Sequence, residues 1–166
     1  MEQSSKTLTF VVPAYNMETY LERCVESLLS ATDNSDIEVL IVDDGSSDGT
    51  PELADMYERR WPGNVRAIHQ VNKGHGGAVN TGIANATGMY VKVVDADDWV
   101  DMPSIDTLMG TLRVQRVATD PVDMIVTNYV YDKVGKRVKH TVNFRHAMAT
   151  NTVLGWDDLG CFGVAE

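Results

Sequence analysis

The first hundred residues alternate between short apolar runs and amphipathic segments, and this alternation restricts the fold more than any other feature. Between the apolar runs, apolar residues recur at spacings of three and four, which is typical of helices that bury one face. Strands that alternate with helices form a parallel sheet with right-handed crossovers. We therefore predict an α/β fold with a mostly parallel sheet and helices on both faces. The expected strands are residues 8–12, 37–42, 65–71 and 89–94.

The first two expected helices have recognisable starts. One is expected over residues 17–29, with Asn16 as its N-cap, because asparagine side chains accept hydrogen bonds from the free N–H groups of a first turn. The second is expected after Thr50, with Thr50 as the cap and Pro51 in the first helical position.

The rest of the chain has weaker signals. A glycine-rich turn is expected at residues 74–77, before a third helix that would stop near Gly88. A fourth helix is expected to begin near Pro103. The segment 123–144 is expected to form two strands around a turn at 133–136, which would add an antiparallel hairpin to the sheet. At 166 residues the chain has the size of one domain, so we predict a single domain over 1–166.

Composition restricts the partners. The formal net charge of −10 argues against binding to a nucleic-acid phosphate backbone. The sequence has no apolar run of about 18 residues and no secretion-signal pattern at its start. It has two cysteines, Cys24 and Cys161, which are too few for a disulfide framework, so a cytoplasmic setting is expected. We expect Cys24 to be a core residue of the first helix.

Each expected strand is followed by a polar loop. Parallel strands end at the same edge of a sheet, and ligands of such sheets bind outside the carboxyl ends of the strands. We therefore expect the four loops to converge on one crevice. They are Pro13-Ala14-Tyr15-Asn16, Asp43-Asp44-Gly45-Ser46, Asn72-Lys73-Gly74-His75 and Asp95-Ala96-Asp97-Asp98.

The stretch VKVVDADDWVD places four aspartates within seven positions after a strand. Strand alternation would point Asp95 and Asp97 to the same side, where one pKa should rise unless a cation intervenes. Carboxylate and phosphate oxygens are the ligands that Mg²⁺ or Mn²⁺ prefers. The alternative is an acidic turn in which Asp98 or Asp101 caps the next helix. From this stretch alone, both interpretations stay open.

The remaining loop residues are ambiguous when taken singly. One carboxylate of Asp43-Asp44 can accept from a nucleobase N–H, although a simple turn explains the pair equally. Lys73 and the glycines after it suggest an anion site or a flexible turn. We expect His75 to be exposed, Tyr15 to pack at the sheet edge and Trp99 to lie in the core.

Taken in order, four segments resemble the nucleotide-sugar-binding half of the family 2 glycosyltransferases, which have the GT-A fold. The resemblance runs from about Leu8 to about Tyr131, and its D-D-G-S-x-D-G-T and D-A-D-D motifs are highly specific. The segments are VVPAYNMETYLERCVESLL, IEVLIVDDGSSDGT, NKGHGGAVNTGIANATG and VKVVDADDWVD.

The resemblance implies a nucleotide diphosphate sugar donor, with a UDP-sugar the commonest in the family. Asp44 would accept from the base N–H beside Asp43, and Lys73 would lie near the base and phosphates. Asp95 and Asp97 match the family's DXD motif, so Asp95 should lie near the ribose and the metal, and Asp97 should ligate Mg²⁺ or Mn²⁺. The other positions assigned to the nucleotide sugar are Pro13, Ala14, Tyr15, Asn16, Gly74, Asn80 and Ala96.

The family's reaction adds further expectations. An acceptor hydroxyl, on a carbohydrate or a lipid-linked sugar, would attack the anomeric carbon with inversion in surface polysaccharide synthesis. Asp157 and Asp158 are candidates for the general base, although their surroundings depart from the family's motif. The chain is therefore expected to be a donor-binding domain, truncated at its C-terminus, of a longer enzyme in the cytoplasm or at the inner membrane face. The alternative is a nucleotide-sugar-binding module that transfers nothing.

Overall fold

The computed structural model describes residues 6–132, 139–146, 148–149 and 151–155. The chain divides into two compact units, residues 1–119 and 120–166. Asp157 and Asp158, the candidate bases, lie outside the described residues, so their role stays a prediction.

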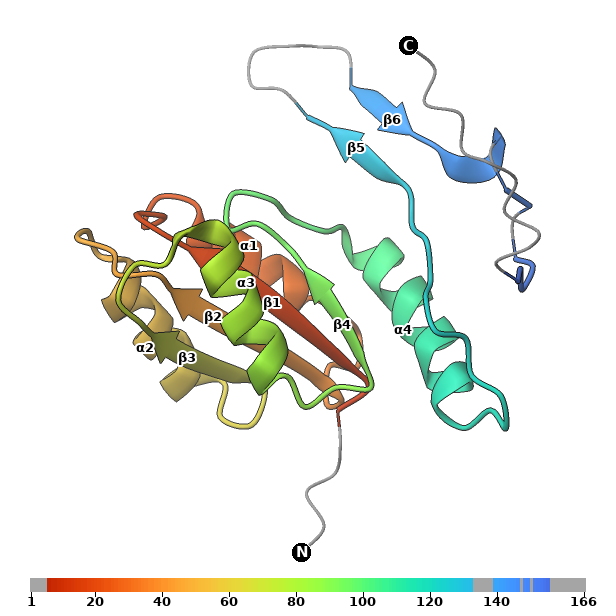
Figure 1. Cartoon of the computed structure of the whole chain (residues 1–166), viewed down its shortest axis with the longest axis horizontal. Coiled ribbons are helices and arrows are strands. Elements are labelled where there is room, and N and C mark those ends of the chain that lie inside the picture. The colour runs from red at the N-terminus through yellow and green to blue at the C-terminus, as the bar shows by residue number, and fades with distance from the viewer. Residues whose placement is uncertain (1–5, 133–138, 147, 150, 156–166) are drawn as a thin grey trace, which may run out of the picture. The chain divides into compact units, whose positions relative to one another are not determined.

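The first unit is built on a four-stranded parallel sheet with the strand order β3-β2-β1-β4 (Figure 1). The central strands β1 and β2 are buried along their whole length, which explains why their sequences are almost entirely apolar. The expected α/β fold with a mostly parallel sheet is confirmed. The strands are β1 (Leu8–Ala14), β2 (Ile37–Asp43), β3 (Val65–His69) and β4 (Tyr90–Val93).

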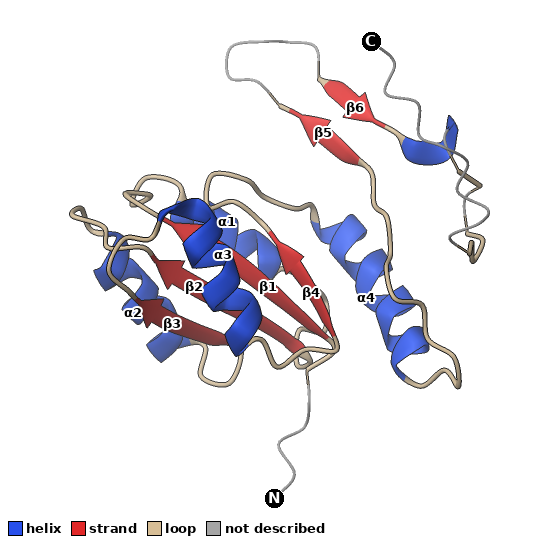
Figure 2. Ribbon diagram, viewed as in Figure 1, coloured by secondary structure: helices blue, strands red, loops and turns tan. Residues whose placement is uncertain are grey.

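Helices cover both faces of this sheet, as Figure 2 shows, with α3 on one face and α1 and α2 on the other. Gly82 lets α3 lie close to β1, since a Cβ added at Gly82 would come within 2.2 Å of Val11 Cγ1. The helices are α1 (Leu21–Leu28), α2 (Thr50–Arg60), α3 (Gly74–Asn85) and α4 (Met102–Arg116).

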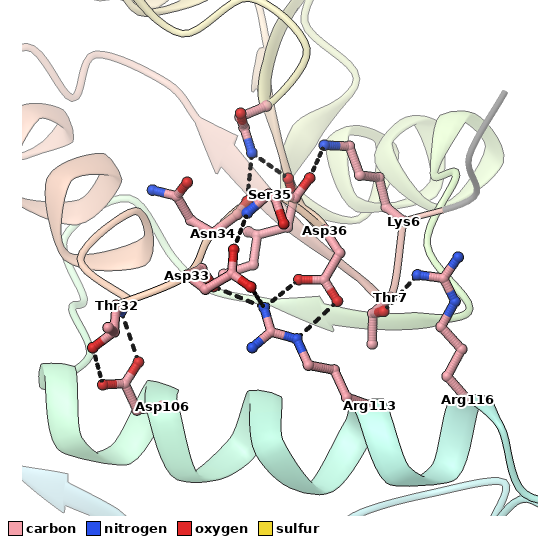
Figure 3. Close-up of polar contacts among 12 residues, drawn as sticks. Lys6, Thr7, Thr32, Asp33, Asn34, Ser35, Asp36, Asp106, Arg113 and Arg116 are labelled. Atoms are coloured by element: carbon pink, nitrogen blue, oxygen red, sulfur yellow. Dashed lines mark hydrogen bonds and ion pairs between the residues drawn. The ribbon is translucent and has the colours of Figure 1, made fainter.

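Helix α4 is held by polar contacts at three places along its length (Figure 3), and at its C-terminal end Arg116 Nη1 donates to Thr7 Oγ1 at 3.0 Å. Asp106 accepts from the Thr32 amide at 2.8 Å and from the Thr32 hydroxyl at 2.7 Å. Two turns further on, the Arg113 guanidinium donates to the Asp36 carboxylate, with 3.1 Å between Nε and Oδ2. These bonds fix α4 against the segment that precedes β2, while its apolar side packs into the unit through Ile105, Met109 and Leu112.

The expected caps of the first two helices are wrong. Helix α1 begins at Leu21 with Tyr20 in the cap position, and Asn16 instead adopts a positive φ of 54° in the loop before it. Helix α2 begins one residue earlier than expected, with Gly49 as its N-cap. The Thr50 hydroxyl accepts from the Met17 amide at 2.8 Å, so it links two loops rather than capping its own helix.

The glycine-rich segment is also different from the expectation. Residues 74–77 form the first turn of α3 rather than a turn before it, and only Gly74 needs a positive φ, of 76°. The helix ends at Asn85, three residues before Gly88. Gly88 instead passes close to β1, where a Cβ would meet the Thr9 amide nitrogen at 2.6 Å.

In the fourth helix one expectation is met. Asp101 is the N-cap of α4, and its side chain accepts from the Ser104 amide at 3.1 Å. One of the four aspartates in the acidic stretch is thus a helix cap, as the simpler interpretation required. The other three need a separate explanation.

The second unit contains the expected antiparallel hairpin. Strands β5 (Tyr129–Tyr131) and β6 (His140–Val142) pair with each other and are followed by a 3₁₀ turn, η1 (Phe144–His146). The two strands form a sheet of their own, so the expectation that they extend the main sheet is wrong. Over the described part of the chain, every helix is too short or too polar to cross a bilayer.

Candidate functional site

The polar loops meet at the carboxyl ends of the strands. Ala14 and Asp43, the last residues of β1 and β2, are paired in register, and Asp43 is paired with His69 at the end of β3. The Asp44 amide donates to the Ala14 carbonyl at 2.9 Å, and the Gln70 amide donates to the Asp43 carbonyl at 3.0 Å. The first three loops are therefore adjacent, as the strand order requires.

The fourth loop joins them through a side-chain contact. His75 Nε2, in the first turn of α3, lies 2.8 Å from Asp95 Oδ1 after β4. Both side chains are exposed, as expected for His75. The four loops thus meet at one edge of the sheet as predicted, while the crevice expected among them stays a prediction.

The loop after β1 is locked to the loop after β2. The Asn16 amide donates to Ser46 Oγ at 2.9 Å, and Asn16 Oδ1 accepts from the Ser47 amide at 2.8 Å. Pro13 and Ala14 are buried beneath this junction, whereas Tyr15 is 49% exposed at the rim. Tyr15 therefore does not pack at the sheet edge as expected, and its ring is accessible to a ligand.

Asp43 is buried at the end of β2 and serves the loop that follows it. Its Oδ1 accepts from the Ser46 amide at 3.0 Å, and its Oδ2 lies 3.0 Å from His69 Nδ1. The other ring nitrogen of His69 lies 3.1 Å from Asp55 Oδ1 on α2. Asp43 therefore shapes the site from beneath, through its contacts with protein groups.

Asp44 is 2% exposed and is held in a fixed orientation. Its Oδ1 accepts from Gln70 Nε2 at 2.6 Å and from the Lys73 amide at 2.8 Å. Burial would raise the pKa of this carboxyl, but the bonds from Gln70, the amides of Lys73 and Gly74 and the Lys73 charge outweigh it, so the pKa is lowered. Asp44 is consequently a carboxylate that can only accept hydrogen bonds.

The acidic loop is a turn, and this corrects the argument from strand alternation. Strand β4 ends at Val93, and the Asp98 amide closes the turn on the Asp95 carbonyl at 2.9 Å. Ala96 is only 1% exposed, so its side chain anchors the turn while Asp95 and Asp97 on either side are exposed. The two carboxylates are presented outward because the residue between them is buried.

Helix α1 holds this turn from below. The Cys24 thiol lies 3.7 Å from the Asp95 carbonyl oxygen, and the Val100 amide donates to Ser27 Oγ at 3.1 Å. Cys24 is buried, as expected, and burial together with three nearby aspartates raises the pKa of its thiol to about 12. This thiol is therefore a structural group rather than a nucleophile.

Trp99 was expected in the core, and this is wrong. The side chain is 37% exposed, and the Arg23 guanidinium carbon lies 3.3 Å from the centre of its ring. Such stacking stabilises an arginine over an aromatic face. The arginine covers the ring in place of core residues.

The acidic turn concentrates negative charge that protein groups only partly offset. Burial and the neighbouring charges of Asp97 and Asp95 raise the pKa of the Asp98 carboxyl. Within the described residues, no group of three or more His, Cys, Asp or Glu is placed to hold a metal ion. Mg²⁺, however, is commonly bound by one or two carboxylates together with substrate phosphates. The exposed Asp95 and Asp97 fit that kind of shared site.

Beside the acidic turn, the start of α3 offers features that suit an anion. Lys73 is exposed in the N-cap position, and open space surrounds the positions where Gly74 and Gly76 would carry a Cβ. The backbone N–H groups of a first helical turn attract phosphate. Asn80 lies further along the same helix and is exposed.

Two residues of this region were missed in the sequence analysis. His69 is the last residue of β3 and contacts Asp43, and Gln70 directly follows the strand and donates to Asp44. Their position at the end of a strand was a usable signal, because parallel strands end at the edge of the sheet where ligands bind. They were overlooked because residues 65–71 were assigned to the strand itself.

Comparisons with known proteins agree with this geometry. The family model described as Glycosyl transferase family 2 matches residues 9–162. Glycosyltransferase GlyG of Streptococcus pneumoniae is 40% identical over 131 residues, which cover 78% of this chain and 41% of GlyG. The chain thus spans about two fifths of this curated relative.

Solved structures give the same result for the fold. S. aureus TarS 1-349 in complex with UDP-GlcNAc matches with a TM-score of 0.59 and 26% identity, over 66% of this chain and 32% of that one. Mannosyltransferase PcManGT from Pyrobaculum calidifontis, in complex with GDP-Man and Mn²⁺, matches with a TM-score of 0.57 and 27% identity, over 67% and 32%. The expected GT-A fold is confirmed.

Proposed function

The chain belongs to glycosyl transferase family 2, and from that premise we propose that it binds a nucleoside diphosphate sugar across the carboxyl ends of β1 to β4. The observation that supports this most directly is the junction of four polar loops at one edge of the sheet. Asp44 binds the loop of Lys73, and His75 of the same loop binds Asp95. A ligand that bridges these loops would touch a base-accepting carboxylate, a lysine and an acidic pair.

For the base half of the donor, we assign Asp44 as the acceptor of a base N–H, with Asp43 supporting the loop from below. Tyr15 is exposed at the rim and can stack on the base, beside the buried Pro13 and Ala14. Uracil has the required N–H, and TarS was crystallised with UDP-GlcNAc. A UDP-sugar is therefore the proposed donor.

For the diphosphate half, we assign Lys73 and the first turn of α3 around Gly74 to the phosphates. Asp97 is proposed as the metal ligand and Asp95 as its neighbour near the ribose. A bound Mg²⁺ or Mn²⁺ would supply Lewis-acid stabilisation of the departing diphosphate. The structure of PcManGT is a complex with both GDP-Man and Mn²⁺.

The proposed reaction is transfer of the sugar with inversion. The acceptor hydroxyl forms the new bond to the anomeric carbon as the bond to the diphosphate breaks, and its proton passes to an acidic residue. Asp157 and Asp158 remain the candidates for this base. The proposed acceptor is a carbohydrate or lipid-linked sugar, in the cytoplasm or at the inner face of the membrane.

The experiment is a calorimetric titration of the chain with UDP, with and without Mn²⁺, followed by a sugar-release assay with UDP-GlcNAc. We expect UDP binding that requires the metal, and little release by this chain alone. Binding without any release on adding acceptors would favour the second candidate, a donor-binding module, which the match to about two fifths of GlyG keeps open. Absence of binding to both UDP and GDP would contradict the donor-site assignment.

A further inference from the structure

Gln70 is held at both ends of its side chain. Its Nε2 donates to Asp44 Oδ1 at 2.6 Å, and its Oε1 accepts from the Thr81 hydroxyl on α3 at 2.6 Å. Its backbone amide is also fixed, by the bond of 3.0 Å to the Asp43 carbonyl. A side chain restrained in this way has already lost its rotamer freedom, so it can orient a neighbour without further entropic cost.

The neighbour that Gln70 orients is Asp44. The hydrogen bonds that Asp44 accepts from Gln70 Nε2, at 2.6 Å, and from the Lys73 amide, at 2.8 Å, end on the same oxygen, Oδ1. The carboxylate is therefore fixed by one oxygen. The other oxygen, Oδ2, keeps the lone pairs that a ligand N–H would need.

The lowered pKa of Asp44 adds a chemical restriction to this geometry. An ionised carboxylate offers no proton, so it can accept from a ring N–H but cannot bond to a bare ring nitrogen. Uracil, thymine and guanine present an N–H on the ring itself, whereas the matching ring nitrogen of cytosine is unprotonated and cytosine can donate only from its amino group. The orientation of Oδ2 therefore bears on which class of nucleotide binds.

We propose that Gln70 is a positioning residue for donor recognition, which acts through Asp44: held by Thr81, it fixes Asp44 Oδ1 and leaves Oδ2 for the N–H of an imide-type base. This inference rests on the proposed function, since it assigns the donor base to Asp44. Gln70 need not touch the donor. Its effect is on base selectivity and donor affinity rather than on the transfer step.

The opposite role would give an opposite result. If Gln70 only occupied the place of the base until the donor arrived, its removal would strengthen UDP binding, because a competing internal donor would be lost. The bond to Thr81 argues against this, since Gln70 would have to leave two partners at once to vacate Asp44.

The first test is calorimetric titration of the full chain and of Gln70→Leu with UDP and with CDP in Mn²⁺. We expect Gln70→Leu to bind UDP about tenfold more weakly, equivalent to ~1.4 kcal/mol. The preference for UDP over CDP should fall by a similar factor, because an unoriented carboxylate discriminates poorly. Unchanged or tighter UDP binding by Gln70→Leu would overturn the proposal.

A second variant, Gln70→Glu, guards against simple misfolding. The introduced glutamate is nearly the same shape and must share a proton with Asp44 to keep the short contact. Relative to the wild-type chain at each pH, we expect UDP affinity close to normal at pH 5 and about tenfold weaker at pH 8. A ratio that does not change with pH would contradict the positioning role.

A control variant and a measurement without ligand distinguish failure of the donor site from failure of the Gln70 role. Gln115→Leu removes a glutamine side chain from α4 and should leave UDP affinity unchanged. By NMR, the pKa of the Asp44 carboxyl should rise in Gln70→Leu whether or not UDP binds. If the wild-type chain binds neither UDP nor GDP, the donor site fails; if it binds UDP and Gln70→Leu behaves like it, only the role of Gln70 fails.

Discussion

Two acidic loops lie at the same edge of the sheet, and they differ in whether their aspartates are buried and hydrogen-bonded. Asp43 and Asp44 after β2 are 3% and 2% exposed, and protein donors bind both. Asp95 and Asp97 after β4 are exposed, and their charges add to partial burial in raising the pKa of Asp98. The aspartates after β2 are thus buried and hydrogen-bonded parts of the fold, whereas those after β4 carry charge that protein groups only partly offset.

The comparison shows that carboxylate number alone does not identify a metal site. What separates the loops is the supply of N–H donors. Backbone amides and Gln70 bind the first pair, whereas among the described residues the Asp95 side chain contacts His75 alone. A buried carboxylate without donors would be strongly unfavourable, so the first pair requires them. The second pair can remain in water and exchange it for a cation.

The largest expected difference between the loops is in stability. Asp44→Ala should lower the free energy of unfolding by about 2 kcal/mol, because it leaves the partly buried donors of Gln70 and Lys73 without the carboxylate that they bind. Asp97→Ala should change it by less than about 0.5 kcal/mol, since that side chain is exposed. Urea denaturation of both variants measures this, and equal losses would remove the distinction.

For UDP affinity, the larger effect is expected from the exposed acidic loop after β4. Asp97→Ala should weaken UDP affinity in Mn²⁺ about 30-fold, or ~2 kcal/mol, whereas in EDTA neither the wild-type chain nor the variant should bind UDP. Asp101→Ala is the matched control, because it removes a charge from the same stretch but only the cap of α4. It should cost about 1 kcal/mol of stability and leave UDP affinity intact. Loss of affinity in both variants would point to general charge rather than a ligand.

The stability contributed by the contact between Asp43 and His69 should also depend on pH. Hydrogen bonding to Asp43 raises the pKa of His69 against the effect of burial, and Asp55 raises it further. The added stability is complete below about pH 6.5, the unfolded value, and is lost as pH rises through the higher folded value. After screening at this half-exposed site, we expect a difference below about 1 kcal/mol between wild type and His69→Gln.

Urea denaturation from pH 5.5 to 8.5 measures that difference. It should be largest at the acid end and shrink toward the alkaline end. A difference that is constant across the range would mean that the charge of His69 does not contribute, and that only the neutral ring's packing is lost.

The smallest effect is expected within the acidic turn. Asp98→Asn should raise the free energy of unfolding by a few tenths of a kcal/mol at neutral pH, because it removes a repelled charge at a site open to solvent. Thermal denaturation with and without Mn²⁺ is the measurement. The gain should shrink when the metal is present, and a destabilised variant would show that Asp98 is needed as a charge.

Much of the fold was predictable because it depends on long apolar patterns. IEVLIV reads as a strand buried on both faces, and β2 is buried at every position. Local caps were not predictable in the same way, because Asn16 and Thr50 bond to each other's loops across about 30 residues. A cap preference is a local property, and here non-local partners took both side chains.

For the site, the strand ends predicted which loops meet, and the structure bears this out. The orientation of Asp44 was not predictable, since it depends on Gln70 and on Thr81 eleven residues later. The outward direction of Asp95 and Asp97 was not predicted, since strand alternation placed the two side chains only on the same side as each other. It follows from a buried alanine in a turn, which composition alone cannot distinguish from strand alternation.

That alanine has a consequence for variation in this loop. Ala96 sits with 1% of its surface accessible, above α1, where Cys24 lies against the neighbouring carbonyl. A larger residue at position 96 would have to fit at a site that is already closed to solvent, so we expect the turn to shift to make room for it. The spacing between Asp95 and Asp97 therefore depends on the buried methyl group of Ala96, which need not contact a bound donor.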